Sequence, residues 1–231
     1  GEATVVCGRY GRTTPAAVFA EMIEAEVSQR LGDDPGYNLP PGTFQPIVLH
    51  HPDTDQRTLG PAFWGFIPAF MSDDKLKPIN ARSDKLNGRF FNKAYSHQRC
   101  LVPVDWWYEW RKEGDAKQPY LLRPTANNPF FFAGIWSKAS SLPADHQASG
   151  RVTFAIITRE PHPDIAHIHN RQPAALTREA AREWIGSGND TADLDALLAE
   201  GCYDNYTSWP VTRKMGNPAN NAPEITDEIR T

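Results

Sequence analysis

A cysteine close to the start of the sequence is the first candidate for a chemical role. Cys7 precedes Gly8 and Arg9, and a tight turn with a cation nearby is a setting that lowers the pKa of a thiol. The thiolate is the nucleophilic form, so the sequence proposes Cys7 as a nucleophile. A structural cysteine is the alternative. Structural burial is the expectation for Cys100, which opens an apolar strand, and for Cys202.

Three of the seven histidines fall within one short segment, PHPDIAHIHNRQP at 161–173. His169 is followed by Asn170 and Arg171, and Pro173 ends any local helix, so the sequence predicts a loop that presents an imidazole beside a guanidinium. A surface histidine without a role is the alternative. A zinc site is not expected, because neither a CxxC nor an HExxH pattern accompanies the histidines.

A glutamate lies among aromatic residues in WWYEW at 106–110. The alternation of a strand puts Trp107, Glu109 and Arg111 on one face and Trp106, Tyr108 and Trp110 on the other. A carboxylate among indole rings is desolvated, which raises its pKa toward values useful for acid-base catalysis. The alternative is a structural ion pair between Glu109 and Arg111.

The most basic part of the chain contains Asn80 and Arg82. Residues 75–123 hold eleven Lys and Arg against five Asp and Glu, a balance of +6. Such a patch, interleaved with Phe90, Phe91 and the tryptophans, is suited to the backbone and stacked bases of single-stranded nucleic acid. A solvated face without a ligand is the alternative.

Composition excludes several classes of protein. The 231 residues carry a formal net charge of -4, are 40% hydrophobic, and contain three cysteines. The acidic balance disfavours a protein that coats nucleic acid without selectivity, and no apolar run approaches the roughly 20 residues of a membrane helix. The start GEATVV lacks the features of a secretory signal. We therefore expect a protein of the cytoplasm, without disulfides or a metal.

The elements that must position these residues are short. A helix is expected after Thr13-Thr14-Pro15, with Phe19, Ile23, Val27 and Leu31 facing the core. A second helical region should follow Thr177, with Ala181, Trp184 and Ile185 inward, a break at GSGND (186–190), and a further turn carrying Leu194, Leu197 and Leu198. The stretch from Arg213 to the end reads as a polar loop.

Strands are predicted at FQPIVLH, TLGPAFWGF, RCLVPVDWWYEWR, PYLLRP, PFFFAGIW and RVTFAIIT, between 44 and 158. Residues 106–111 and 118–123 should form a hairpin with its tip near Gly114-Asp115, and 151–158 should be buried on both faces. No linker divides 1–231. The sequence thus predicts a single α+β domain with a mostly antiparallel, barrel-like β core flanked by helices.

Nine short segments, taken together and in order, resemble the SRAP family (SOS-response-associated peptidase domain), whose members form covalent crosslinks to abasic sites in single-stranded DNA. The segments are VCGRY (6–10), YNLPPGT (37–43), FWGFIP (63–68), PINAR (78–82), WWYEW (106–110), KQP (117–119), IITR (156–159), DIAHIHNRQP (164–173) and SWPVTRKMGNP (208–218). No single segment is decisive, and the ordered set is specific.

The resemblance implies four catalytic positions. The family's nucleophilic cysteine falls on Cys7, its asparagine on Asn80, its glutamate on Glu109 and its histidine on His169. It implies no cofactor, abasic single-stranded DNA as the partner, and a cytoplasmic monomer at the nucleoid or replication fork. In its chemistry the α-amine of an N-terminal cysteine forms a Schiff base with the ring-opened sugar, and the thiol closes a thiazolidine.

The resemblance also implies DNA contacts. Arg9, Arg82 and Thr158 match residues around the phosphates and the abasic sugar. Phe70 and Met71 fall where relatives place a bulky wedge beside the lesion, and Pro41 falls on the same rim. These residues are therefore expected at a DNA-facing surface.

Six residues precede Cys7, whereas the family's working cysteine is the first residue of the mature chain. GEATVV is therefore interpreted as a leader removed before Cys7, by the domain's own cysteine among other routes, or as a remnant of expression. Alternatively, the protein binds abasic DNA without a stable crosslink. Two other functions stay open: a thiol peptidase that uses Cys7, His169 and Asn80, and a non-covalent DNA-binding module.

Overall fold

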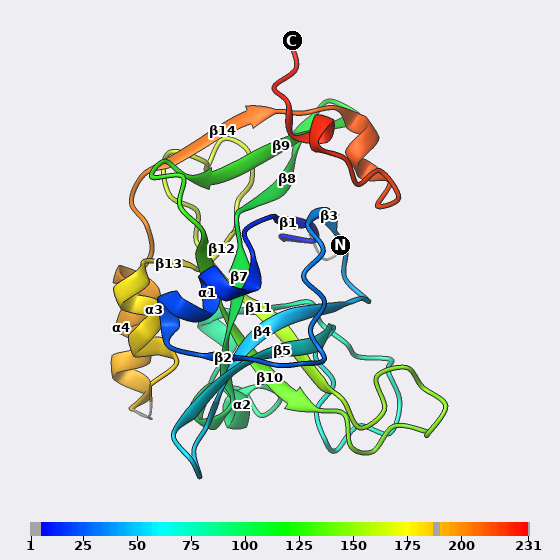
Figure 1. The fold of residues 1–231 in the computed structure, drawn as a ribbon. Helices are drawn as coiled ribbons and strands as arrows, with labels where there is room; N and C mark the ends of the chain where they lie inside the picture. Colours follow the sequence, from blue (N-terminus) through cyan, green and yellow to red (C-terminus); the bar gives the residue numbers. More distant parts are fainter. Residues whose placement is uncertain (1–5, 187–189, 231) are drawn as a thin grey trace.

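The computed structural model describes residues 6–186 and 190–230. Two β-sheets form most of the fold, a smaller one at the top of Figure 1 and a larger one below it. The smaller sheet has the strand order β14-β9-β8-β1-β3. Its strands are β1 (Tyr10–Arg12), β3 (Gly36–Leu39), β8 (Trp106–Glu113), β9 (Ala116–Pro124) and β14 (Tyr206–Pro210).

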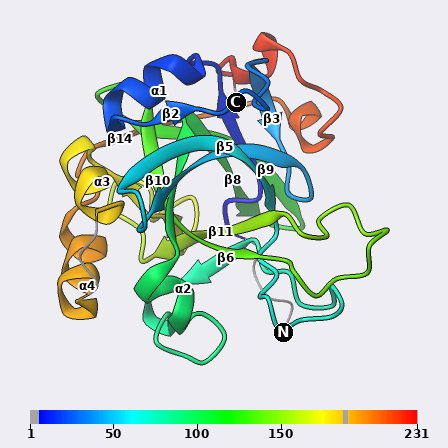
Figure 2. The same ribbon diagram turned by 60° about the horizontal axis from the view of Figure 1, so that its bottom comes forward.

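The larger sheet has the order β12-β11-β10-β7-β4-β5-β2, with β6 beside β11 and β13 beside β10. Most pairings are antiparallel, and a two-pair parallel contact between β5 and β11 curls the sheet without completing a true barrel (Figure 2). Its strands are β2 (Glu26–Val27), β4 (Phe44–His51), β5 (Gln56–Trp64), β6 (Asn80–Arg82), β7 (Arg99–Val104), β10 (Phe130–Lys138), β11 (Val152–Arg159), β12 (Gln172–Pro173) and β13 (Ala175–Leu176).

The helices lie on the flanks of the larger sheet (Figure 1). They are α1 (Ala16–Ile23), α2 (Asn92–His97), α3 (Arg178–Trp184) and α4 (Thr191–Glu200), with 3-10 turns at Ser83–Lys85, Arg213–Gly216 and Pro223–Thr226. The predicted α+β class with a mostly antiparallel, barrel-like core is therefore confirmed. Among the helices of the described residues, none has the length and apolar character needed to cross a membrane.

The predicted hairpin is present. β8 pairs with β9 from Trp107↔Leu122 to Glu113↔Ala116, so Gly114 and Asp115 form the tip. The segment 99–111, read from the sequence as one apolar run, is instead two strands in different sheets. The chain turns at Asp105, whose carboxylate accepts hydrogen bonds from the backbone N–H groups of Thr13 and Thr14.

The first helix is shorter than predicted. It ends at Ile23 because Glu24 adopts a left-handed conformation (φ 55°), which closes the helix, and residues 26–27 then pair with the edge of β5. Phe19 and Ile23 are buried, but Val27 is 43% exposed and so lies outside the core. Thr14 does not cap the helix, since its hydroxyl donates to Asp105.

The later helices follow the prediction more closely. The Thr177 side chain caps α3, and Ala181, Trp184 and Ile185 are buried. α4 buries Leu194 and Leu198, whereas Leu197 is only partly buried. The predicted break at 186–190 falls mostly on 187–189, outside the described residues.

The segment from Arg213 is more than the polar loop that was predicted. Its two 3-10 turns bury Met215 and Ile225 against Tyr108 and Leu121 of the small sheet. Apolar burial of this kind stabilises the outer face of the β8–β9 hairpin. The inner face of the same hairpin is thereby left for the interior between the sheets.

Candidate functional site

Cys7 and Glu109 meet in the interior between the two sheets. The backbone N–H of Cys7 donates a hydrogen bond of 2.9 Å to Glu109 Oε1. β8 positions the carboxylate as the alternation predicted, with Trp107 and Glu109 buried on the inner face and Trp110 toward the C-terminal segment. In the described part of the chain, no ion pair joins Glu109 to Arg111.

Burial dominates the electrostatics of this pair. Glu109 is 2% exposed, and desolvation raises the pKa of its carboxyl well above the ordinary value, while the hydrogen bond from Cys7 lowers it in part. The Cys7 thiol has no exposed surface, and its pKa is also raised, first by burial and then by the charge of Glu109. The expectation of an acidified thiol was therefore wrong for this state of the chain, because burial and the Glu109 charge outweigh the hydrogen bond from the Arg9 backbone, which lowers the thiol pKa.

Replacing Glu109 with Gln is expected to stabilise the chain that retains residues 1–6. The pKa of Glu109 is raised in the folded state. Glu109 therefore does not lower the free energy of unfolding below its unfolded pKa of about 4.3, but it lowers that free energy increasingly as pH rises through the folded pKa. The melting temperature of Glu109→Gln should exceed that of the parent at pH 7 to 8, by about 2–4 °C for each kcal/mol, and converge with it near pH 4. Glu113→Gln, at an exposed position of the same strand, should melt like the parent. If Glu109→Gln raised the melting temperature equally at every pH, ionisation of the buried carboxylate would not be the cause.

Asn80 lies on the opposite wall, at the start of β6. It pairs with Ile156 of β11 in parallel register, and its side-chain Nδ2 is buried without a hydrogen-bond partner among the described residues. A buried amide donor without a partner is unusual and points to a ligand or a water at that place. Cys7, Val6 and Ile156 belong to one apolar cluster, against which Ile79 also packs.

His169 borders the same cluster through Ile165 and Ile168, which anchor its loop. Its Nδ1 lies 3.1 Å from the backbone N–H of Arg171 and 3.2 Å from the backbone carbonyl of Arg171. When Nδ1 carries no proton, it can accept a hydrogen bond from the Arg171 N–H. When the ring is protonated, Nδ1 can instead donate to the Arg171 carbonyl. Burial lowers the pKa of His169, the hydrogen bond with the Arg171 backbone raises it in part, and the charge of Lys117 lowers it further.

The predicted pairing of imidazole and guanidinium is only partial. The Arg171 side chain turns away from His169 and donates from Nη2 to the carbonyl and hydroxyl oxygens of Thr158, at 3.0 and 3.3 Å. Thr158 itself is 1% exposed. Arg171 was not among the predicted site residues, although its position in HNRQP, two residues after His169, was a signal.

The two predicted phosphate-binding arginines differ in their surroundings. Arg9 donates to Asn38 Oδ1 and to the carbonyls of Met215 and Gly216, each at 2.9 Å, so its guanidinium ties down the C-terminal segment. Arg82 is exposed and forms two 3.0 Å hydrogen bonds with Asp84. A phosphate at Arg82 would compete with an exposed carboxylate, and one at Arg9 would displace backbone carbonyls.

The wedge residues point in different directions. Phe70 is 68% exposed, whereas Met71 packs against a separate apolar cluster that includes Phe63 and Ile67. Pro41 is partly buried in the turn after β3. Phe70 is therefore the more accessible of the two wedge candidates, and Met71 is partly buried.

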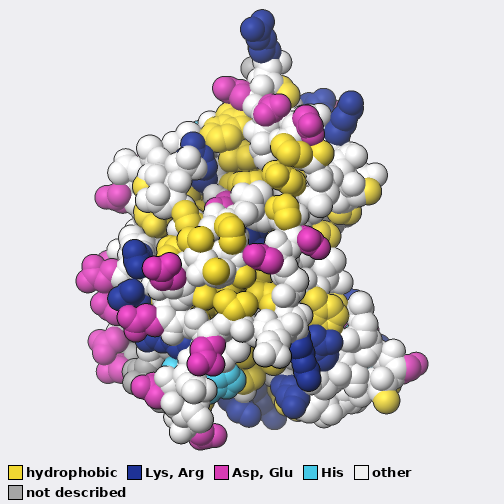
Figure 3. All heavy atoms as spheres, viewed as in Figure 1, with side chains coloured by type: hydrophobic (Ala, Val, Ile, Leu, Met, Phe, Trp, Pro, Cys, Tyr) yellow, Lys and Arg dark blue, Asp and Glu magenta, His cyan; other side chains and the backbone are white. Residues whose placement is uncertain are grey.

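Not every cation of the basic run at 75–123 lies at the surface. Arg99 is buried and donates to the carbonyls of Trp184 and Tyr95, and Lys112 and Lys117 lie on the β8–β9 hairpin, far along the chain from Arg82. Arg82, Arg159 and Arg171 line a surface hollow of about 500 Å³. In the view of Figure 3, acidic side chains gather on the flank where Figure 1 draws α3 and α4, and Lys and Arg along the lower edge.

Residues 1–5 of the predicted leader lie outside the described residues, but Val6 is described. Val6 is 6% exposed and packs in the cluster that contains Cys7. Cys7 has a left-handed backbone with φ 44°, a conformation that costs a non-glycine residue about 1–3 kcal/mol. Among the described residues there is no group of three or more His, Cys, Asp or Glu that could hold a metal ion.

The sequence profile of a family described as SOS response associated peptidase (SRAP) matches residues 6–218. The abasic site processing protein YedK of Escherichia coli K12 is 31% identical over 231 residues, which cover 97% of this chain and 100% of that protein. The abasic site processing protein YoqW of Bacillus subtilis 168 is 32% identical over 229 residues, covering 95% of this chain and 98% of that protein.

Two crystal structures have a similar fold. A protein from Bacteroides thetaiotaomicron superposes with a TM-score of 0.80 at 22% identity, covering 97% of this chain and 100% of that one. A phage-related protein from Bordetella bronchiseptica gives a TM-score of 0.70 at 28% identity, covering 90% of this chain and 95% of that one.

Proposed function

The chain belongs to the SRAP family, and from that membership we propose that it processes abasic sites in DNA, by binding the lesion in single-stranded DNA and joining to it covalently through Cys7. The observation that carries the proposal is the 2.9 Å hydrogen bond from the Cys7 nitrogen to Glu109. If the chain began at Cys7, its α-amine would occupy the place of this N–H, beside a buried carboxylate suited to proton transfer.

The proposed reaction has two steps. The α-amine adds to the aldehyde of the ring-opened deoxyribose, and loss of water gives an imine. The thiol then adds across the carbon–nitrogen double bond: sulfur bonds to carbon, and the thiol proton passes to nitrogen, which gives a five-membered thiazolidine. Because amine and thiol belong to one residue, the effective concentration of the thiol is very high. Glu109 moves the protons of the first step.

Asn80 and His169 have complementary parts in this scheme. The unpartnered Nδ2 of Asn80 would donate to the amine or to a sugar oxygen. His169 would act as the acid that opens the sugar ring, and its lowered pKa makes the protonated imidazole a stronger acid. Arg82 would hold a flanking phosphate once released from Asp84.

Removal of residues 1–6 is part of the proposal, since an amide nitrogen at Cys7 cannot form an imine. Two observations support it. Cleavage before Cys7 would remove the left-handed φ of Cys7, because that angle requires a preceding residue, and it would remove Val6 from the cluster around the thiol.

The thiol peptidase is the weaker alternative. Peptide hydrolysis through Cys7 needs a thiolate activated by a base, and here burial raises the thiol pKa. A non-covalent DNA-binding module remains the second alternative, and it requires no role for Cys7.

The chain from Cys7 is expected to bind a single strand with one abasic site and to convert it into a species that survives denaturing electrophoresis. An intact strand and a fully paired duplex are the DNA controls, because a paired strand opposes entry of the lesion into the site. Turnover of unrelated peptides would favour the peptidase. Selective binding without any adduct would favour the non-covalent module.

A further inference from the structure

The loop that carries His169 is fastened to a strand of the other sheet. This loop, residues 160–171, connects β11 to β12, and the residue that follows it, Gln172, is 1% exposed. Gln172 Oε1 accepts a 2.7 Å hydrogen bond from the backbone N–H of His162, which closes the loop on itself. Gln172 Nε2 donates to the hydroxyl of Tyr206 at 3.2 Å.

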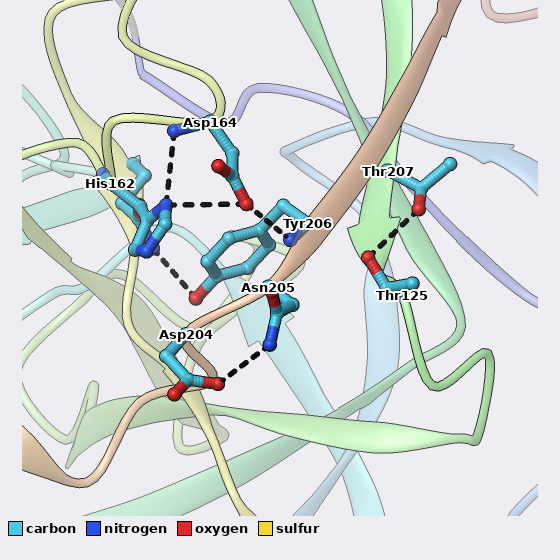
Figure 4. A network of polar contacts seen from close by, with 8 residues as sticks. Thr125, His162, Asp164, Asp204, Asn205, Tyr206 and Thr207 are labelled. Atoms are coloured by element: carbon cyan, nitrogen blue, oxygen red, sulfur yellow. Dashed lines mark hydrogen bonds and ion pairs between the residues drawn. The ribbon is translucent and has the colours of Figure 1, made fainter.

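Tyr206 opens β14, in the smaller sheet, and makes further contacts with the start of the loop. Its backbone N–H donates to Asp164 Oδ2 at 3.0 Å, and its ring lies 5.4 Å from that of His162. The other side of the ring packs edge-on against Trp107, two residues from Glu109, at 5.9 Å. Figure 4 shows His162, Asp164 and Tyr206 converging, while Thr207 points away toward Thr125.

We propose that Gln172 and Tyr206 are positioning residues, which clamp the His169 loop against the small sheet so that the imidazole stays half-buried beside the site. Neither residue touches the reacting atoms. The proposal rests on the proposed function for its kinetic consequence, but the clamp itself is a property of the free protein. Both ends of the loop are held, so His169 keeps its contact with the Arg171 backbone.

Loss of the clamp should change the titration of His169. Burial is the main cause of its lowered pKa, the hydrogen bond with the Arg171 backbone raises the pKa in part, and the charge of Lys117 on β9 lowers it further. The Arg171 guanidinium is turned to Thr158. In a loosened loop, water would reach the imidazole, and the imidazole would move away from Lys117. The pKa of His169 should then rise toward its ordinary value near 6.5.

Two variants test the clamp in the chain from Cys7. Tyr206→Phe removes one hydroxyl and keeps the ring on Trp107. Gln172→Leu removes the amide contacts with His162 and Tyr206, and with them a contact with the Pro173 carbonyl. Thr207→Val is the matched control. Thr207 follows Tyr206 on β14, and its substitution removes the 2.9 Å contact with Thr125 without touching the loop. The readouts are NMR titration of His169, amide exchange at 165–171, and the single-turnover rate of adduct formation from pH 5 to 8.

Both variants are expected to raise the pKa of His169, speed amide exchange in the loop, and slow adduct formation by about tenfold to a hundredfold. Their affinity for a strand with a stable abasic analogue should stay within about twofold of the parent, and Thr207→Val should match the parent throughout. An unchanged His169 titration in both variants overturns the clamp, even if their melting temperatures fall. Absence of an adduct in the parent overturns the proposed function, while titration and exchange still decide the clamp.

Discussion

A chain that begins at Cys7 is expected to form a DNA adduct that survives denaturing electrophoresis, and a chain that retains residues 1–6 is expected to form none. With Val6 attached, the Cys7 nitrogen is an amide that donates to Glu109, and its lone pair is delocalised. The thiol is also sealed, since Cys7 has no exposed surface and Val6 is 6% exposed.

Variants at Cys7 distinguish the role of its α-amine from the role of its thiol. In the chain from residue 7, Cys7→Ser keeps the α-amine and loses the sulfur, so it should give an adduct only when borohydride reduces the imine. Cys202→Ser, at the partly buried cysteine whose thiol contacts the Leu198 carbonyl, is the control and should behave like the parent. A stable adduct from the chain that keeps residues 1–6, with those residues shown by mass spectrometry to be present, would contradict the proposed chemistry.

Glu109→Gln in the chain from Cys7 is expected to slow adduct formation by about 10²–10⁴-fold. The amide keeps the shape and an acceptor oxygen for the Cys7 nitrogen, but it cannot take up or release a proton during imine formation. Binding of a stable abasic analogue should change little, because the variant leaves Arg82, the proposed phosphate-binding residue, untouched. The measurement is a single-turnover time course at saturating protein.

Glu113→Gln is the matched control for this second prediction. Glu113 lies on the same strand as Glu109 but is exposed near the hairpin tip, so its loss should leave the rate unchanged. An unchanged rate in Glu109→Gln would instead mean that solvent moves the protons. In that case the carboxylate would only orient the Cys7 nitrogen.

The local chemistry of the sequence anticipated much of the fold. Alternation in WWYEW predicted that Glu109 faces inward among aromatic residues, and the apolar run at 151–158 predicted a strand buried on both faces. Such patterns are reliable because each depends only on the period of one element.

Features that depend on partners far along the chain were missed. The first helix ends at Ile23 because Glu24 is left-handed and residues 26–27 pair with β5. The helical period of the sequence does not reveal that pairing. The segment 99–111 divides at Asp105 because Thr13 and Thr14 bind its carboxylate. Met215 and Ile225 are buried only because Tyr108 and Leu121 lie beneath them.

The sequence by itself determined the set of residue types at the site, the α+β class and the family, because these follow from residue identity, local period and the order of motifs. Only the tertiary structure decided that the Cys7 nitrogen donates to Glu109, that both residues are buried, and that the Arg9 guanidinium donates to backbone carbonyls. Desolvation arises from atoms contributed by many distant segments, so the pKa of the Cys7 thiol, predicted from its neighbours to fall, rises in the folded chain.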